Sequence, residues 1–519
     1  MPFTTKCGFI RFFSLLCTFV ILFSVFGDIS PVNAAEASDI TSSSNVVTEG
    51  FYNPPVVLDG NYRDYTNAYN GATVTASNDS GIAYLYFIFE TVPPEFTVED
   101  TATGEKRSFS ANGMIHVVLD LKKAFGYVPK AIKAVLDFHI AVSEIYLFSE
   151  GTLPSWVQTW EAPLTESDML LLVSHSDDDQ LFFAGVLPLY AGQLGMKVQV
   201  AYLTNHNDVA NRRHELLDGL WHTGVRNYPI IAEFPDLYSE SYDEALSVYG
   251  NAGYAKKDFT DFVSKLIQDT RPLVVVTHDT EGEYGHGTHI LCTASVIEAS
   301  ETCTTPTGYG EIEGKWYVAK IYLHLYKDNK LTLDLDKPLS AFDGKTAFAV
   351  SQEAFRFHVS QHWTWFYDWI YGGSTPITKA SEIATHNPME YGLYSSAVGF
   401  DKECNDFFEN LETISERDER LEAESKAAVE ASISAEEASK AAEESARLES
   451  ESIAESVAQS IADSERLDKE SREKADSEAE SRAAEAARDD GSDKFAAVAV
   501  LAAAMVCVCI LLVIQFRKR

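Results

Sequence analysis

The chain has 519 residues, 45% of them hydrophobic, which is enough for two or three folded domains with proper cores. Its formal net charge of -37 would repel a phosphate backbone and argues against nucleic acid as a partner. The net charge alone does not indicate which substrate the protein binds.

The N-terminus has the pattern of a secretory signal peptide. Basic residues precede an apolar stretch from Phe12 to Phe26. Val32 and Ala34 are small enough for positions -3 and -1 of a signal-peptidase cleavage site. We therefore expect residues 1–34 to be removed, so that the mature chain begins at Ala35.

Three cysteines lie outside the two apolar ends of the chain, namely Cys292, Cys303 and Cys404. An odd number cannot all pair. A bridge from Cys292 to Cys303 is one possibility, but no disulfide framework is implied.

Between about Glu49 and Gly151, short runs of β-branched and aromatic residues such as IAYLYFIFE alternate with Gly, Pro, Asn and Asp clusters. This pattern predicts an antiparallel β-sandwich at residues 45–151. Its opening, VVLDGNYRDYT, and its regular strands resemble discoidin or galactose-binding-like modules. Two interpretations remain open: a structural domain that packs against its neighbour, or a sugar-binding domain.

The stretch from Asp168 to Gln180, DMLLLVSHSDDDQ, is an apolar run that ends abruptly in a histidine and three carboxylates. A continuously apolar run is typical of a parallel strand buried on both faces. Open α/β sheets bind ligands at the carboxyl ends of such strands. By itself the pattern fits either half of a metal site or an acidic turn before a helix.

A second segment, Arg271 to Thr293, holds another buried strand, a Gly-rich turn and two histidines three residues apart. A catalytic zinc keeps three protein ligands and one open position for water. His175, Asp178 and one histidine of this segment would complete such a set.

These motifs resemble those of the LmbE-like (PIG-L) zinc-dependent N-deacetylases. The family motif AHPDDE corresponds to Ser174 to Asp179, and GHxDH corresponds to Gly285 to His289. The resemblance extends over roughly residues 165–300. Further shared features lie between the motifs: the strand end at Leu203 to Asn205, Arg212 with Glu215, and Gly224 with Val225.

The resemblance implies a zinc (Zn2+) cofactor held by His175, Asp178 and His289. Asp177 would be the general base that deprotonates the zinc-bound water, and His286 would act on the tetrahedral intermediate. Physical chemistry fits these roles, because a carboxylate can accept the proton and return it, while a donor histidine stabilises an oxyanion.

The same resemblance aligns Arg212 and Tyr284 with positions that contact the substrate. The chain also departs from the family pattern: Ser176 replaces a proline, Asp179 a glutamate, and Thr288 an aspartate. None of these changes removes a ligand or the base, but they change the groups that position them.

Strands and helices alternate after the first motif, which predicts an α/β, Rossmann-like domain at residues 165–400. We expect a strand at 197–203, helices at 212–222 and 259–268, and a strand that ends at Thr277. Residues 310–372 are rich in aromatic side chains, including Trp363 and Trp365. These side chains form either core or a rim on which sugars stack.

Residues 401–490 contain neither Gly nor Pro and predict an acidic helical stalk. Residues 401–493 hold 30 acidic and 12 basic residues, a net of -18, so about half of the excess charge lies there. The large apolar residues are irregularly spaced. This favours a solvated helix, with a weak coiled coil left open, over a tight oligomer.

Residues 496–514 form an unbroken apolar run, followed by basic residues at 515–519. This predicts one transmembrane helix with a cytoplasmic tail. Together with the signal peptide, it predicts a single-pass protein of the cell membrane with its catalytic domain outside, as on a Gram-positive bacterial surface.

We therefore expect an anchored extracellular zinc hydrolase that acts on a linear amide C–N bond, the N-acetyl group of an N-acetylglucosamine-type sugar or surface glycan. The alternative is a non-catalytic glycan-binding surface protein that retains the deacetylase fold. The intact metal and base positions favour the enzyme.

Overall fold

The computed structural model describes residues 35–209, 211–306 and 308–486. The chain divides into two compact units, one that ends at Glu419 and one that begins at Arg420, and each is considered by itself. The predicted signal peptide, transmembrane segment and tail lie outside the described residues.

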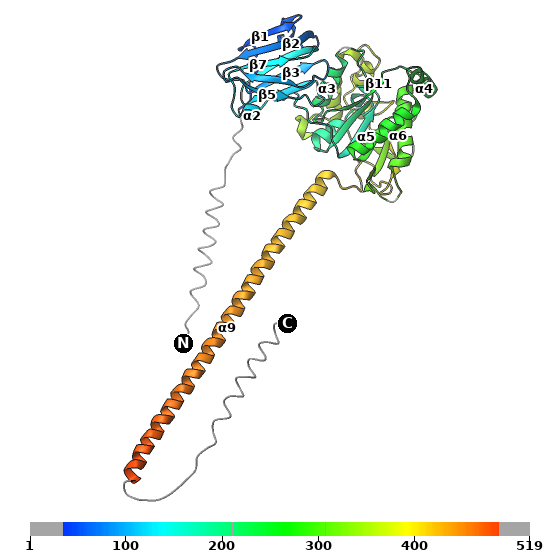
Figure 1. Cartoon of the computed structure of the whole chain (residues 1–519). Coiled ribbons are helices and arrows are strands. Elements are labelled where there is room, and N and C mark those ends of the chain that lie inside the picture. Colours follow the sequence, from blue (N-terminus) through cyan, green and yellow to red (C-terminus); the bar gives the residue numbers. More distant parts are fainter. Residues whose placement is uncertain (1–34, 210, 307, 487–519) are drawn as a thin grey trace. The chain divides into compact units, whose positions relative to one another are not determined.

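The N-terminal part is an antiparallel sheet of eight strands, coloured blue to cyan in Figure 1, so the predicted β-rich region is confirmed. The start of β2 pairs with β8, and its second half pairs with β1 and β7. Alternate residues of β4 and β7 are buried, as expected where one face covers a core. The strands are β1 (Asn45–Phe51), β2 (Thr66–Ser77), β3 (Tyr84–Phe89), β4 (Phe96–Asp100), β5 (Glu105–Phe109), β6 (His116–Asp120), β7 (Ala131–Leu136) and β8 (Ile140–Phe148).

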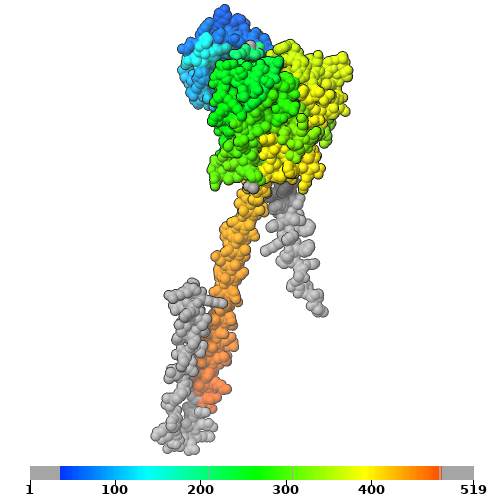
Figure 2. All heavy atoms as spheres, turned by 90° about the vertical axis from the view of Figure 1, so that its right-hand side faces the viewer, coloured from blue at the N-terminus to red at the C-terminus, as the bar shows by residue number. Residues whose placement is uncertain are grey.

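Strand β3 is buried on both faces. One face joins the core of the sheet, and on the other face Tyr86 packs in a second buried cluster with Val157 of the following linker. His116 Nε2 lies 3.1 Å from His214 Nδ1 of the α/β region. The N-terminal sheet therefore lies directly against the α/β region, as the space-filling view also shows (Figure 2).

A seven-stranded sheet forms the α/β region in the order β11-β10-β9-β12-β15-β17-β16. The first five strands are parallel, β17 runs antiparallel to them, and β16 pairs antiparallel with β17. Every residue of β9 and β12 is buried, as expected for central parallel strands. The strands are β9 (Ser167–Val173), β10 (Val198–Asn205), β11 (Ile230–Pro235), β12 (Pro272–Thr277), β15 (Lys320–His324), β16 (Lys330–Thr332) and β17 (Glu390–Ser396).

The predicted strand–helix alternation is confirmed, including the helix at 212–222, and Figure 1 shows α5 and α6 beside each other. The helices of this region are α3 (Arg212–His222), α4 (Tyr242–Asn251), α5 (Lys256–Thr270), α6 (Gly287–Cys303), α7 (Ala347–Phe355) and α8 (Phe366–Tyr371). Shorter elements are α2 (Leu121–Phe125), the hairpin β13 (Gly310–Ile312) and β14 (Lys315–Tyr317), and single turns at Pro54–Leu58, Asp178–Gln180, Pro188–Gln193, Ser340–Phe342, Val359–Gln361 and Ala380–Glu382.

The long helix α9 (Ile414–Ala486) starts later than the sequence predicted, because residues 401–413 fold onto the α/β region. Phe407 is fully buried there. The buried ammonium of Lys320 lies 2.5 Å from the carboxylate of Asp401 and needs that partner. At the start of β9, Asp168 accepts a hydrogen bond of 2.7 Å from the backbone N–H of Ile414.

Helix α9 is continuous (Figure 1), which confirms a helical segment. Its large apolar residues are largely exposed, from 48% for Leu421 to 60% for Leu467. This exposure agrees with a solvated helix and gives no support to the coiled coil.

Two sequence predictions need correction. The membrane location is not upheld, because none of the helices in the described part of the chain is long and apolar enough to cross a bilayer, and α9 is polar. The bridge from Cys292 to Cys303 is wrong: both thiols are free. Eleven residues of α6 separate them, which is about 16 Å along a helix.

Asp401→Ala should destabilise the protein by about 3–5 kcal/mol, because it leaves the buried ammonium of Lys320 without its carboxylate. Thermal and urea unfolding of the two proteins measure this loss. Glu422→Ala, which removes an exposed ion pair of α9 with Lys426, is the matched control and should change stability by less than about 1 kcal/mol. Equal losses in the two variants would contradict the proposed role of residues 401–413.

Candidate metal centre

The candidate site lies at the carboxyl ends of the parallel strands. His175, Asp177 and Asp178 follow β9, Asp236 follows β11, and His286 and His289 come from the first turn of α6. Together with aromatic residues of the segment 361–366, most of these side chains line a cavity of about 460 Å³. This is where open α/β sheets place ligands.

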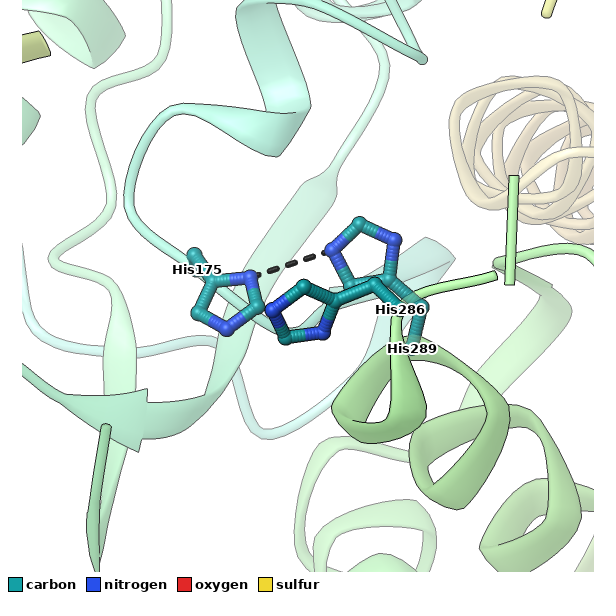
Figure 3. A group of neighbouring side chains, drawn as sticks. All are labelled: His175, His286 and His289. Carbon is teal, nitrogen blue, oxygen red and sulfur yellow. Dashed lines mark hydrogen bonds between the residues drawn. The ribbon is translucent and has the colours of Figure 1, made fainter. Parts of the chain in front are cut away.

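The three predicted metal ligands converge. Nδ1 of His175 lies 3.1 Å from Nε2 of His289 and 3.2 Å from Oδ2 of Asp178, while Nε2 of His289 lies 3.3 Å from Oδ1 of Asp178. Figure 3 shows the rings of His175 and His289 facing each other, with His286 beside them. Ligands about 2.0 Å from a tetrahedral zinc ion stand about 3.3 Å apart, so this donor set fits such an ion.

The groups behind the ligands fix which ring atoms face inward. Nδ1 of His289 lies 2.7 Å from the carboxylate of Glu283, and its Nδ1–H therefore donates outward, leaving the Nε2 lone pair for a metal. The backbone N–H of His175 donates to Oδ2 of Asp178 at 2.7 Å. Nε2 of His175 lies 3.4 Å from Asp236. A carboxylate thus orients His289, and a second carboxylate lies within ion-pair distance of His175.

Charge at the centre is balanced within the cluster. Burial opposes ionisation of Asp178, but His289, His175 and His278 hold the pKa of its carboxyl well below the usual range. The same holds for Glu283, where His278 and His289 outweigh burial and lower the pKa. Both carboxylates are ionised, as metal binding and ligand orientation require.

Two other sets of three donors also lie close together among the described residues: His175 with His286 and His289, and Asp178 with His278 and His289. However, Nε2 of His278 accepts the backbone N–H of Ser174 at 2.9 Å, and its Nδ1 lies 3.1 Å from Glu283. Both nitrogens are therefore engaged. Nδ1 of His286 is likewise engaged by the N–H of Thr288, so His175, Asp178 and His289 remain the candidate ligands.

Asp177, the predicted base, is almost fully buried and lines the cavity. Arg212 donates to its Oδ1 at 3.1 Å. Nε of Arg212 also donates to the hydroxyl of Ser176 at 2.9 Å, so the serine that replaces the motif's proline helps to hold this arginine. Arg212 therefore does two things: it lines the cavity, and it holds the carboxylate of the candidate base.

His286 caps the N-terminus of α6. Its Nδ1 accepts the backbone N–H of Thr288 at 3.2 Å, which leaves Nε2–H as the donor. Burial, with His175 and His289 close by, lowers the pKa of His286 to about 2, so the ring is neutral. The hydroxyl of Thr288 donates to the carbonyl of Leu237, so this residue supplies no carboxylate to the histidine.

Gly287 explains how α6 can begin so close to the site. A Cβ atom there would lie 2.2 Å from the carbonyl oxygen of Ser241. Only glycine permits this approach, and the helix then places His286 and His289 on the cavity side, one turn apart.

Asp179, the other changed position of the first motif, does not line the cavity. Gln180 donates to its Oδ2 at 2.5 Å. Burial, reinforced by Asp177 and Asp178, raises the pKa of the Asp179 carboxyl well above its usual range. It is therefore a neutral group of the supporting structure.

The rim of the cavity is aromatic. Trp363 is 84% exposed, Tyr238 66%, Trp365 48% and Tyr284 36%. Trp363 and Trp365 thus belong to the rim of the cavity. Trp369 of the same segment is instead partly buried against the core. Tyr284 lines the cavity, as the resemblance implied.

Sequence reasoning missed Asp236, Glu283 and His278. Asp236 directly follows an apolar run, IIAEFP, that is now seen to be β11, and a polar residue at such a strand end was the available signal. Glu283 lies in a turn, in left-handed conformation (φ 51°), so its direction was not predictable from local periodicity.

Residues 170–300 match the PIG-L family, described as GlcNAc-PI de-N-acetylase. A 1D-myo-inositol 2-acetamido-2-deoxy-alpha-D-glucopyranoside deacetylase of Streptomyces avermitilis is 26% identical over 181 residues, which are 31% of this chain and 61% of that protein. The enzyme of that name from Segniliparus rotundus is 44% identical over 59 residues, which are 11% of this chain and 18% of that protein.

Among solved structures, the N,N'-diacetylchitobiose deacetylase of Pyrococcus horikoshii is 16% identical, with a TM-score of 0.29, and covers 44% of this chain and 84% of its own. A TM-score of 0.29 does not establish a common fold over the whole chain. The chain spans less than two thirds of the length of the curated relatives it matches. The similarity to the PIG-L family thus covers residues 170–300, whereas the discoidin-like character of the N-terminal sheet is not confirmed.

Glu283→Gln should weaken zinc binding about 10- to 100-fold, because the amide holds the Nδ1–H of His289 less strongly than the carboxylate does. Competition with a zinc chelator measures the affinity. Glu281→Gln, two residues away on the exposed side of the same turn, is the control and should bind zinc like the parent chain. Unchanged affinity in Glu283→Gln would contradict the orienting role.

Proposed function

We propose that the protein is a zinc-dependent deacetylase that removes the acetyl group from an N-acetylated sugar of the N-acetylglucosamine type. The observation that carries the proposal is the convergence of His175 Nδ1, Asp178 and His289 Nε2 within 3.3 Å of one another, beside a second carboxylate. The PIG-L match over residues 170–300 and the printed names of the relatives support the substrate class.

His175, Asp178 and His289 would hold the ion. When bound, zinc would polarise the acetamido carbonyl and lower the pKa of a water molecule in the cavity. The chain must then supply a group that takes the proton of the attacking water, a donor for the developing negative charge, and a surface that holds the sugar.

Asp177 is suited to the proton transfer. It lines the cavity beside the ligand Asp178, and the bond from Arg212 fixes the direction of its carboxylate. The proton that Asp177 accepts from water must reach the amine that leaves, and His286, being neutral, has no spare proton to give. Asp177 would therefore carry the proton in both directions.

His286 is suited to stabilise the oxyanion as a neutral donor. Its Nδ1 is occupied by the N–H of Thr288, so only the Nε2–H is available. Thr288 supplies no carboxylate to this ring, so His286 would act by hydrogen bonding alone. The aromatic rim formed by Trp363 and Trp365 provides faces on which a pyranose ring can stack.

Asp177→Asn should retain zinc and lower kcat by about 10²- to 10⁴-fold, because the amide keeps the shape but cannot accept a proton. Asp178→Ala, the matched control, removes a ligand, so zinc content should fall together with activity. Acetate release from N,N'-diacetylchitobiose and metal analysis measure both effects. Near-parental acetate release by Asp177→Asn would exclude Asp177 as the base.

His286→Ala should also retain zinc, and it should lower kcat by about 10²- to 10³-fold, the usual loss of one oxyanion donor. Because the neutral ring supplies only a hydrogen bond, His286→Gln should recover part of the lost rate. A variant that loses zinc would instead identify His286 as a ligand.

A further inference from the structure

A second cavity, of about 390 Å³, lies where the N-terminal sheet meets α3, and we call it the junction cavity. It shares no lining residue with the cavity of the metal centre. Four parts of the chain form it: the N-terminal sheet with the loop that carries Tyr62, the linker around Trp156, α3 with its following turn, and Phe357 after α7. Its size falls within the range of small-molecule sites, about 300–1,000 Å³.

Aromatic rings form one wall of the junction cavity. Tyr86 and Tyr146 are stacked, with ring centroids 5.8 Å apart, and Trp156 meets Tyr146 edge-on at 5.0 Å. Trp156 is 47% exposed, which is unusual for a ring held by such contacts. Trp221 of α3 adds a further indole, with the guanidinium of Arg226 over it at 3.9 Å.

A buried carboxylate lies among these rings. Asp218 of α3 is only 6% exposed and lines the junction cavity. Its Oδ1 accepts a hydrogen bond of 2.6 Å from Gln158, and its Oδ2 accepts one from the hydroxyl of Tyr62. A carboxylate offers about four acceptor positions. Asp218 therefore keeps acceptor capacity for hydroxyl groups of a ligand.

The charge of the lining restricts the class of ligand. An anion would meet the carboxylate of Asp218, and NH1 of Arg226 already donates to the carbonyls of Trp221 and Val225. Burial lowers the pKa of His222 below its ordinary value, so this ring supplies no positive charge at neutral pH. An entirely apolar ligand would cover the carboxylate without a hydrogen bond, which is costly.

A pyranose ring meets these conditions, because it has an apolar C–H face for an aromatic ring and hydroxyl groups for a carboxylate. We propose that the junction cavity binds a neutral pyranose unit of a glycan, with Trp156 as the stacking face and Asp218 as the acceptor of its hydroxyl groups. The proposal does not depend on the deacetylase activity, since it concerns a separate cavity and binding alone.

The junction cavity can also influence the metal centre through α3. Arg212, which contacts the candidate base, and Asp218 lie six residues apart on this helix, about 9 Å along its axis. A glycan held at Asp218 is thus kept near the cavity of the metal centre, which raises the local concentration of its other sugar units.

Calorimetric titration of the full chain carrying Asp177→Asn tests the proposal, because this background keeps acetylated sugars intact. The ligands are neutral trisaccharides: cellotriose, maltotriose, mannotriose and N,N',N''-triacetylchitotriose. We expect at least one to bind, with an affinity that falls about tenfold or more in Trp156→Ala, as the loss of one aromatic contact implies. Trp156→Phe should restore most of it.

Asp218→Asn has the same shape but fewer acceptor positions and should also weaken binding. Tyr52→Ala is the matched control, because this exposed ring lines neither cavity, and it should leave binding unchanged. The proposal is overturned if no trisaccharide binds, or if binding is insensitive to both Trp156→Ala and Asp218→Asn. Acetate release by the parent chain tests the proposed function separately, so either proposal can fail alone.

Discussion

The candidate site depends on the close approach of three groups with lone pairs: Nδ1 of His175, Nε2 of His289 and the carboxylate of Asp178. Two imidazole nitrogens and a carboxylate converge within 3.3 Å, at a site with almost no exposure. Their lone pairs repel one another, so the arrangement needs positive charge among them, either a metal ion or protons on the imidazole rings, and a rigid framework that keeps the side chains together. The buried parallel strands and the first turn of α6 provide that framework.

Carboxylates of the surrounding structure make the convergence possible. Glu283 holds His289 and His278 by their Nδ1 atoms, and Asp236 lies beside His175. Gly287 lets α6 start against the chain at Ser241. These groups act on ring orientation rather than on a substrate. Thr288 stands where the family motif has an aspartate and supplies no carboxylate to His286, and burial beside His175 and His289 lowers the pKa of this ring.

The sequence predicted where the candidate residues converge through its two motifs, because the first directly follows β9 and the second follows β12 after a turn, and both strands are clear apolar runs. It did not predict Glu283 or Asp236, which act through space from a turn and from an unrecognised strand. The helix α9 was predicted from composition, but its start was not. Lys320 and Asp401 are 81 residues apart, and no local pattern indicates that their burial holds residues 401–413 against the sheet.

The most direct test of the central claim is anomalous diffraction at the zinc absorption edge from crystals of the full chain purified with zinc. One peak is predicted, within about 2.0–2.2 Å of His175 Nδ1, a carboxylate oxygen of Asp178 and His289 Nε2, with His278 and His286 outside the coordination sphere. A peak bonded to His278 or His286, or a protein that binds no zinc there, would contradict the account.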